Sequence, residues 1–170
     1  MTADLLSQIW EQSGAWPEFI DTMRLAAFFG NEGQNRKLRL ARLPVTCHEG
    51  AGGHPQQAEE LASAWVLLYL AANIMDSVQD GDPPQPWWAD HGPGMAINTA
   101  TGLYFSASLL LLRMQAHPQL GESALFVAEE FYRRFLVMCS GQHADLIATR
   151  PSVALFWPLA EAKSVASLAM

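Results

Sequence analysis

Charged residues are scarce in this sequence, and positive ones are the scarcest. Lysine and arginine together number 10 against 17 aspartates and glutamates in 170 residues, so the formal net charge is -7. Proteins that bind nucleic acid neutralise phosphates with a basic patch or stripe. An acidic chain without such a stripe argues against nucleic acid as a partner.

Cysteines and targeting signals are also few or absent. Cys47 and Cys139 lie far apart and form no metal-spaced pair, which favours a reduced, cytoplasmic protein. The first ten residues contain neither a basic region nor an apolar stretch. The sequence therefore predicts no signal peptide.

Hydrophobic residues, by contrast, make up 50% of the chain. This supplies a substantial core, and the length fits one domain, 1–170. Two uncharged runs must be compared with membrane spans. Residues 61–75 are too few to cross a bilayer, and residues 94–112 carry several hydroxyl and amide side chains. Both runs indicate buried helices and a protein that is not membrane-spanning.

The alternation that strands need is lacking, whereas helical spacing of apolar residues recurs along the chain. Clusters of glycine and proline at 49–55 and 82–94 interrupt this spacing. The pattern predicts an all-α helical bundle. The expected helices cover roughly 2–12, 17–30, 36–47, 55–81, 95–116 and 119–147, with a last one from about Pro151.

Three aspartates, Asp76, Asp80 and Asp82, follow the first uncharged run with no basic residue near them. Asp76 and Asp80 are four residues apart, so they project from one helix face, where like charges repel. They also lie in the last turn, where the helix dipole disfavours anions. Mg²⁺ would remove both penalties, because it prefers hard oxygen ligands. The alternative is solvated turn residues before a proline-rich loop, which is the expectation for Asp82.

Two further features lie nearer the C-terminus. Gln142 and Asp145 are three residues apart and therefore share a helical face. Lys163 is the only lysine after Lys37 and stands in an otherwise apolar stretch. It is either a surface lysine whose stem covers apolar neighbours or a phosphate contact facing a cavity.

Five short stretches carry a resemblance to a known family. In chain order they are NRKLRL (35–40), DSVQDGD (76–82), HGPGMAINTATGLYFSA (91–107), GQHADL (141–146) and EAKSVASL (161–168). They resemble the motifs G-K-x-x-R-P, D-D-x-x-D, Y-G-x-x-x-A-I-N-x-G-D-x-L, G-Q-x-x-D-L and K-T-x-x-L of the trans-polyprenyl diphosphate synthases. The similarity covers roughly residues 33–168, and it implies a partial isoprenoid synthase fold, the N-terminal half or so of such an enzyme.

The resemblance implies prenyl transfer. Such enzymes bind an allylic prenyl diphosphate through Mg²⁺ between two aspartate-rich motifs, and the allylic cation formed on ionisation is attacked by isopentenyl diphosphate. Carried over motif by motif, the resemblance assigns Mg²⁺ ligation to Asp76, Asp80 and Asp145, diphosphate binding to Arg36 and Arg39, and catalytic roles to Gln142 and Lys163.

The sequence departs from the family pattern at several of these positions. Ser77 replaces the second aspartate of the first acidic motif, and Tyr69 stands where the family tends to place a histidine. The loop after the motif lacks the family's two arginines, and the chain contains no second aspartate-rich motif. Each lost charge-assisted contact costs about 1.5–3 kcal/mol. We therefore do not expect catalysis from these 170 residues alone.

Three functions remain open on the sequence. The first is a prenyltransferase seen as part of a longer chain, which the ending inside an apolar helix favours. The second is a non-catalytic partner subunit or isoprenoid-binding homologue, and the third is a class I terpene cyclase. A partial bundle also predicts a homo- or hetero-oligomer through an apolar helical face. Trp87 and Trp88 are candidates for that contact, unless their loop folds back on the bundle.

Overall fold

The computed structural model describes residues 3–28, 42–117, 120–148 and 152–165. It contains two compact units, Met1–His117 and Pro118–Met170, and each is described by itself. Every regular element in the described residues is helical, which confirms the predicted all-α class. The expectation that residues 1–170 form one domain stays a prediction.

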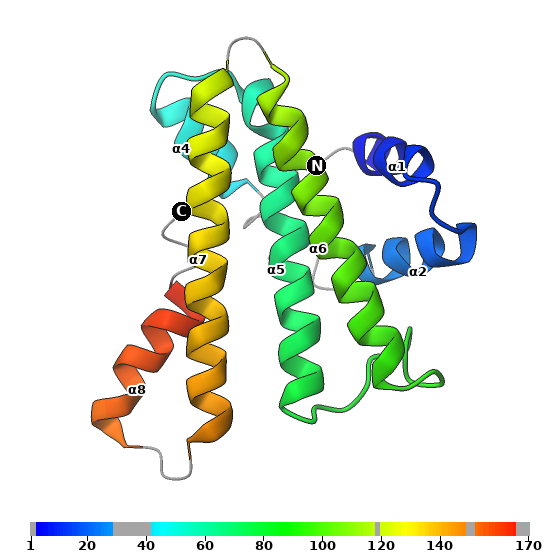
Figure 1. The fold of residues 1–170 in the computed structure, drawn as a ribbon, viewed down its shortest axis with the longest axis vertical. Helices are drawn as coiled ribbons and strands as arrows, with labels where there is room; N and C mark the ends of the chain where they lie inside the picture. Colours follow the sequence, from blue (N-terminus) through cyan, green and yellow to red (C-terminus); the bar gives the residue numbers. More distant parts are fainter. Residues whose placement is uncertain (1–2, 29–41, 118–119, 149–151, 166–170) are drawn as a thin grey trace. The chain divides into compact units, whose positions relative to one another are not determined.

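The predicted helices are found with small changes in their ends (Figure 1). The first unit contains α1 (Ala3–Gln12), α2 (Pro17–Phe28), α4 (Leu43–Gly50), the 3₁₀ turn η2 (Pro55–Ala58), α5 (Glu59–Gln79) and α6 (Pro93–Gln115). The second unit contains α7 (Gly121–Ile147), α8 (Val153–Ala160) and the π-helical turn η3 (Glu161–Val165).

The helix expected at 36–47 differs most from the prediction. Residues 36–41 lie outside the described residues, and α4 continues to Gly50, beyond the predicted end. The Ala51 N–H still bonds the Cys47 carbonyl at 3.1 Å, and a left-handed backbone first occurs in this segment at Gly52, where φ is 88°. Glycine permits a break without forcing one, so the glycine-rich segment stays helical longer than expected.

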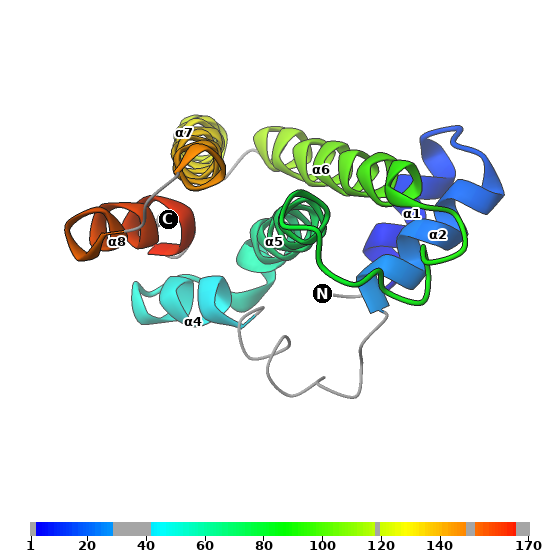
Figure 2. The ribbon, with the colours of Figure 1, turned by 90° about the horizontal axis from the view of Figure 1, so that it is seen from below.

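The core of the first unit is the hairpin of α5 and α6, which lie side by side (Figures 1 and 2). Both helices bury a mixture of alanines and large apolar side chains. A buried leucine side chain contributes about 1.5–3 kcal/mol. The buried apolar residues are Ala62, Ala64, Trp65, Leu67, Leu68, Leu70, Ala71 and Ile74 on α5 and Ala96, Ala100, Leu103, Ala107, Leu110, Leu111 and Met114 on α6.

Opposite its buried face, α6 also exposes large apolar side chains. They recur at helical spacing, so they form one stripe along the helix. The members of this stripe are Ile97, Tyr104, Phe105, Leu109 and Leu112. An apolar helical face of the predicted kind is therefore present on the first unit, although oligomerisation through it stays a prediction.

Helices α1 and α2 pack against the middle of α6, where that helix carries small residues. A Cβ atom on Gly102 would lie 2.5 Å from Phe19 Cζ and 2.8 Å from Met23 Sδ, so the glycine makes room for α2. One turn later, Trp10 of α1 is buried and donates its Nε1–H to Ser106 Oγ at 2.8 Å. Ser106 in turn donates to the Gly102 carbonyl at 2.7 Å.

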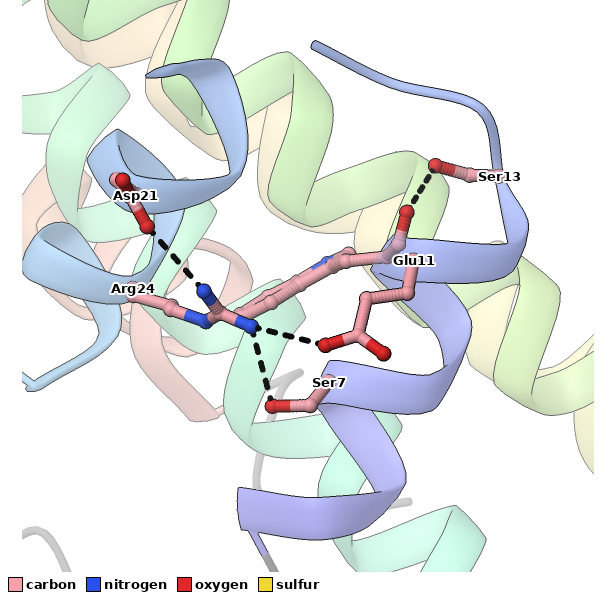
Figure 3. A network of polar contacts seen from close by, with 6 residues as sticks. Ser7, Glu11, Ser13, Asp21 and Arg24 are labelled. Atoms are coloured by element: carbon pink, nitrogen blue, oxygen red, sulfur yellow. Dashed lines mark hydrogen bonds and ion pairs between the residues drawn. The ribbon is translucent and has the colours of Figure 1, made fainter. Parts of the chain in front are cut away.

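Arg24 of α2 links the two N-terminal helices at the surface (Figure 3). Its Nη2 lies 3.4 Å from Ser7 Oγ and 3.5 Å from Glu11 Oε1, both on α1, and its Nη1 lies 3.2 Å from Asp21 Oδ1. The two carboxylates are largely exposed and the Arg24 side chain is 38% exposed, so each ion pair stabilises the unit by at most about 1 kcal/mol.

The loop between α5 and α6 contains two buried tryptophans. Trp87 and Trp88 are only 8% and 6% exposed, and their rings meet edge to face with centroids 6.3 Å apart. Trp87 Nε1–H also reaches Gln85 Oε1 at 3.0 Å. The reading of these tryptophans as an exposed contact for a partner is therefore wrong, because their large apolar rings gain more from burial within the unit.

The other end of the hairpin is held by charges. Glu60, in the first turn of α5, lies 3.9 Å from Arg113 Nε and 3.3 Å from His117 Nε2. Glutamate at a helix start and arginine at a helix end both interact favourably with the helix dipoles. Only the glutamate is mostly buried, with 15% of its side chain exposed.

The second unit pairs one long helix with a short apolar one. Ser152 caps α8, because its Oγ accepts the Leu155 N–H at 3.2 Å. Pro158 lies inside α8 and has no N–H to donate, and the chain continues from this helix into the wider turns of η3. None of the α8 side chains is buried, and Trp157 is 69% exposed.

Two stretches of the described residues, Pro55–Gln79 and Pro93–Gln115, are long and apolar enough to cross a membrane by length and composition. About half of each is buried inside the first unit, as the core helices of many soluble proteins are. This is weak support for membrane spanning, and a protein that is not membrane-spanning stays our expectation.

Candidate functional site

The three aspartates of the first acidic stretch lie where α5 ends. Asp76 is on the last turn, Asp80 is the C-cap residue and Asp82 follows in the loop. Gly81 adopts a φ of 71°, the Gly81 N–H bonds the Val78 carbonyl at 3.4 Å, and the Asp82 N–H bonds the Ser77 carbonyl at 2.9 Å. These two bonds form a Schellman motif. Asp82 is thus a turn residue, as predicted.

Asp76 and Asp80 occupy one face of this helix end, one turn apart. The Asp80 N–H donates to the Asp76 carbonyl at 2.8 Å, so the helical spacing persists up to the cap. Asp80 is exposed, whereas Asp76 is half-buried and its Oδ1 is shielded from solvent. A ligand could approach the pair from the solvent side of Asp80, and Asp76 would hold the inner position.

The donor set at this helix end suits part of a Mg²⁺ site. In the described residues, no three histidine, cysteine, aspartate or glutamate side chains come together in an arrangement that could hold a metal ion. Mg²⁺ in phosphate-binding enzymes is commonly held by one or two carboxylates, with waters and substrate phosphates completing its shell. Two carboxylates on one face fit that incomplete role.

The helix face leading to the aspartates carries polar and aromatic groups. Tyr69 stacks on Trp65 with ring centroids 5.5 Å apart and an interplanar angle of 9°. Asn73 stands between Tyr69 and Asp76 on this face and donates its Nδ2–H to the Tyr69 carbonyl at 2.8 Å. The position where the family tends to place a histidine is thus filled by a phenol ring held in an aromatic stack.

The second unit brings together two of the predicted residues. Lys163 Nζ of η3 lies 2.9 Å from Asp145 Oδ2 of α7, with side chains 27% and 45% exposed. Gln142 is half-buried one turn before Asp145 on α7. The Lys163 ammonium is therefore held by a carboxylate, and its role as a phosphate contact stays a prediction.

Gly141, beside Gln142, is a residue that the sequence analysis did not single out. A Cβ atom on it would lie 2.7 Å from the backbone nitrogen of Lys163 and 2.9 Å from the carbonyl carbon of Ala162. Helix α7 and turn η3 therefore touch at this glycine. An isolated glycine inside an apolar helical pattern was the available signal, since such residues often have a packing reason.

The predicted site residues are divided between the two units, apart from two arginines. Arg36 and Arg39 lie outside the described residues. Asp76 and Asp80 belong to Met1–His117, and Gln142, Asp145 and Lys163 belong to Pro118–Met170. In the described part of the first unit, a cavity of about 220 Å³ lies at Glu60, Arg113 and His117. That is the end of the hairpin away from the aspartates, so we do not assign it to the site.

Comparison with known proteins identifies a family resemblance. No protein-family model matches the sequence. Tryptophan prenyltransferase ComQ of Bacillus subtilis subsp. natto (strain BEST195) is 32% identical over 113 residues, which are 66% of this chain and 34% of ComQ. This similarity supports the predicted resemblance to a trans-prenyl synthase-like family.

A solved structure supports the fold of this synthase-like chain. Geranylgeranyl pyrophosphate synthetase from the archaeon Geoglobus acetivorans superimposes with a TM-score of 0.72 at 17% sequence identity, over 97% of this chain and 56% of the other. The predicted partial isoprenoid synthase fold is confirmed. The synthase-like chain spans about a third of the curated relative and just over half of the solved one.

Proposed function

We propose that the chain is a polyprenyl diphosphate synthase-like protein that binds an allylic prenyl diphosphate with the help of Mg²⁺. The carrying observation is the placement of Asp76 and Asp80 one turn apart at the end of α5. The relatedness to a prenyltransferase and the synthase fold support the same reading. Both relatives are much longer than the region that matches this chain. The complete prenyl-transfer reaction is therefore proposed for this chain and is not taken over from the relatives.

Asp76 and Asp80 would hold the metal from the first unit. Bound Mg²⁺ would supply positive charge to the departing diphosphate. In the second unit, Lys163 would donate hydrogen bonds to diphosphate oxygens and Gln142 would orient the same group. Asp145, proposed as a further metal ligand, bonds Lys163 in this structure, so a cation and the lysine would compete for its carboxylate. Arg36 and Arg39 would add further diphosphate contacts.

The acceptor of the prenyl group has two candidates. The resemblance to polyprenyl diphosphate synthases favours isopentenyl diphosphate, whose double bond would attack the allylic carbon as the C–O bond to diphosphate breaks and a proton is then lost. The relative that is named a tryptophan prenyltransferase favours an indole ring as the nucleophile. The comparisons favour neither the non-catalytic nor the cyclase reading.

The proposal also includes an oligomeric state and a cellular location. The exposed apolar stripe of α6 suits a homo- or hetero-oligomer, and a cytoplasmic location suits the free, exposed Cys47 and Cys139. A synthase-like protein of this kind would use a water-soluble diphosphate and no nucleic acid.

Calorimetric titration with a non-hydrolysable farnesyl diphosphate analogue tests the site directly. We expect binding in Mg²⁺ that disappears on chelation, and its loss in Asp76→Ala and in Asp80→Ala, because each removes one of two carboxylates. Asp82→Ala is the matched control and should bind as the unaltered chain does. Equal binding by all three variants, or binding that ignores Mg²⁺, would contradict the proposed metal role.

The two acceptors can be separated by mass spectrometry. Geranyl or farnesyl diphosphate is offered with either isopentenyl diphosphate or a tryptophan-containing peptide. A diphosphate lengthened by five carbons supports the synthase reading, whereas a peptide heavier by one prenyl group supports an indole acceptor. Products from neither mixture, in a chain that binds the analogue, would favour a binding role.

A further inference from the structure

We propose that Gly141 is a positioning residue. By lacking a side chain it lets η3 touch the backbone of α7, and this contact places the Lys163 ammonium against Asp145 on the Gln142 side of the helix. The inference about the ion pair stands on the structure alone. Its consequence for ligand binding rests on the proposed function.

The contact at Gly141 is made by backbone atoms. A Cβ atom there would lie 2.7 Å from Lys163 N, 2.9 Å from Ala162 C and 2.9 Å from Ala162 Cβ. A neighbour at the far end of a flexible side chain can rotate away, but a peptide group moves only with its whole segment. Any side chain at this position must therefore displace η3 itself.

The displaced segment carries the lysine. Gly141 and Asp145 are four residues apart on α7, so they lie on the same face one turn from each other. Lys163 N approaches the helix at Gly141, and Lys163 Nζ reaches Asp145 Oδ2 at 2.9 Å. With the lysine side chain in its present conformation, a shift of about an ångström at the first contact carries the ammonium beyond the usual hydrogen-bond distance at the second.

The geometry of η3 makes the ion pair between Lys163 and Asp145 sensitive to a substitution at Gly141. It is a π-helical turn that follows a helix containing Pro158. Such turns are rare and often occur at functional sites. The wide turn brings the backbone of residues 162 and 163 against α7, and a regular α-helical continuation would place them differently. Gly141 is the residue on α7 that accepts this wider turn.

An ammonium held in this way is prepared for an anionic ligand. Both partners are partly exposed, at 27% for Lys163 and 45% for Asp145, so a phosphate oxygen can reach the lysine from solvent. The ion pair limits the conformations of a long flexible side chain, and a side chain already ordered loses less entropy when it binds. Gly141 would act through Lys163 and would not itself touch the ligand.

The first test reads the lysine without any ligand. The chain has two lysines, Lys37 and Lys163, so selective isotope labelling of lysine side chains gives two sets of NMR signals, and Lys163→Ala assigns them. Asp145→Asn supplies the reference position of a Lys163 signal without this ion pair. We expect Gly141→Ala to move the Lys163 signal to that reference position.

The matched control is Gly94→Ala. Gly94 also lies in a helix, α6, and a Cβ atom there would meet nothing within 4 Å. This substitution should leave the Lys163 signal where it is. A folded Gly141→Ala chain with an unmoved Lys163 signal would overturn the proposal.

A second variant keeps the test decisive if Gly141→Ala does not fold. Ala162→Gly removes the Ala162 Cβ and so relieves part of the crowding in the double variant Gly141→Ala/Ala162→Gly. The double variant should show the displaced lysine signal relative to Ala162→Gly alone. Identical signals in these two proteins would overturn the proposal equally.

The second test measures binding of the farnesyl diphosphate analogue in Mg²⁺. Gly141→Ala and Lys163→Ala should each weaken binding about ten- to a hundredfold, as expected for one charge-assisted hydrogen bond. Their effects should not add in the double variant, because both remove the same contact. Additive losses of binding free energy in the double variant would overturn the proposal that Gly141 acts through Lys163.

The two tests separate this proposal from the proposed function. If the unaltered chain binds no analogue but the lysine signal moves in Gly141→Ala, the positioning role stands and the diphosphate function fails. If the unaltered chain binds and only Lys163→Ala weakens it, the function stands and the positioning role of Gly141 fails.

Discussion

Two glycines within helices, Gly102 on α6 and Gly141 on α7, both make room for another segment, but they do so against different neighbours. At Gly102 the nearest atoms are the ends of the Phe19 and Met23 side chains. At Gly141 they are the backbone of Ala162 and Lys163. The first contact can adapt by rotating side chains, whereas the second fixes the position of a peptide segment. Packing against side chains is tolerant, and packing against backbone is specific.

The largest effect should come from emptying the buried site that α1 fills on α6, one turn along the helix from Gly102. Trp10 is 1% exposed and bonds Ser106 one turn from Gly102, so Trp10→Ala should lower the free energy of unfolding by about 3–5 kcal/mol. Denaturation in urea, followed by circular dichroism, measures this. The control is Trp16→Ala, since Trp16 is 79% exposed and should change stability by no more than about 0.5 kcal/mol. Similar losses in both variants would show that burial of Trp10 does not hold α1 on α6.

The comparison itself is tested by adding one methyl group at each glycine. Alanine in place of helical glycine gains about 1 kcal/mol from helix propensity, while forcing extra atoms into a packed site costs about 1–3 kcal/mol. Gly102→Ala should therefore be close to neutral, because the neighbours can rotate. Gly141→Ala should lose about 1–2 kcal/mol, because the backbone cannot. Equal stabilities in urea melts would remove the distinction between the two contacts.

The smallest effect on stability should come from the ion pair that Gly141 positions. Lys163 and Asp145 are both partly exposed, so screening by water limits the contribution of their pair to about 0–1 kcal/mol. Lys163→Ala should thus unfold nearly as the unaltered chain does, while it binds the analogue about ten- to a hundredfold more weakly. Arg133→Ala is the control, because it breaks an exposed ion pair with Glu129 on the same helix and should alter neither. A Lys163→Ala chain that is much less stable would assign the lysine a structural role.

Much of the helix pattern could be predicted because it depends on local signals. Gly81 and the prolines after it mark the end of α5, and the Schellman motif supplies the physical reason. The end of α4 was predicted too early, since Gly50 can remain helical and only Gly52 takes a left-handed backbone. The burial of Trp87 and Trp88 was left open, because loop composition does not show which surface a loop covers.

The candidate site could be predicted only in part. The spacing of Asp76 and Asp80 determines that they share a face, and the structure places both at the end of α5. The bond between Lys163 and Asp145 joins residues 18 apart in the sequence. It depends on a π-helical turn and on the approach at Gly141, and neither follows from the periodicity of apolar residues. The role of that glycine therefore became visible only in three dimensions.

The exposed position of Trp157 on α8 has a practical consequence. It is the only tryptophan in the sequence from Pro118 to Met170, and its ring meets Phe156 edge to face at 5.3 Å. A chain in which the other tryptophans are replaced by phenylalanine would show tryptophan fluorescence from this segment alone. Collisional quenching of that emission would then report, in real time, how α8 responds when a ligand arrives or a neighbouring helix loosens.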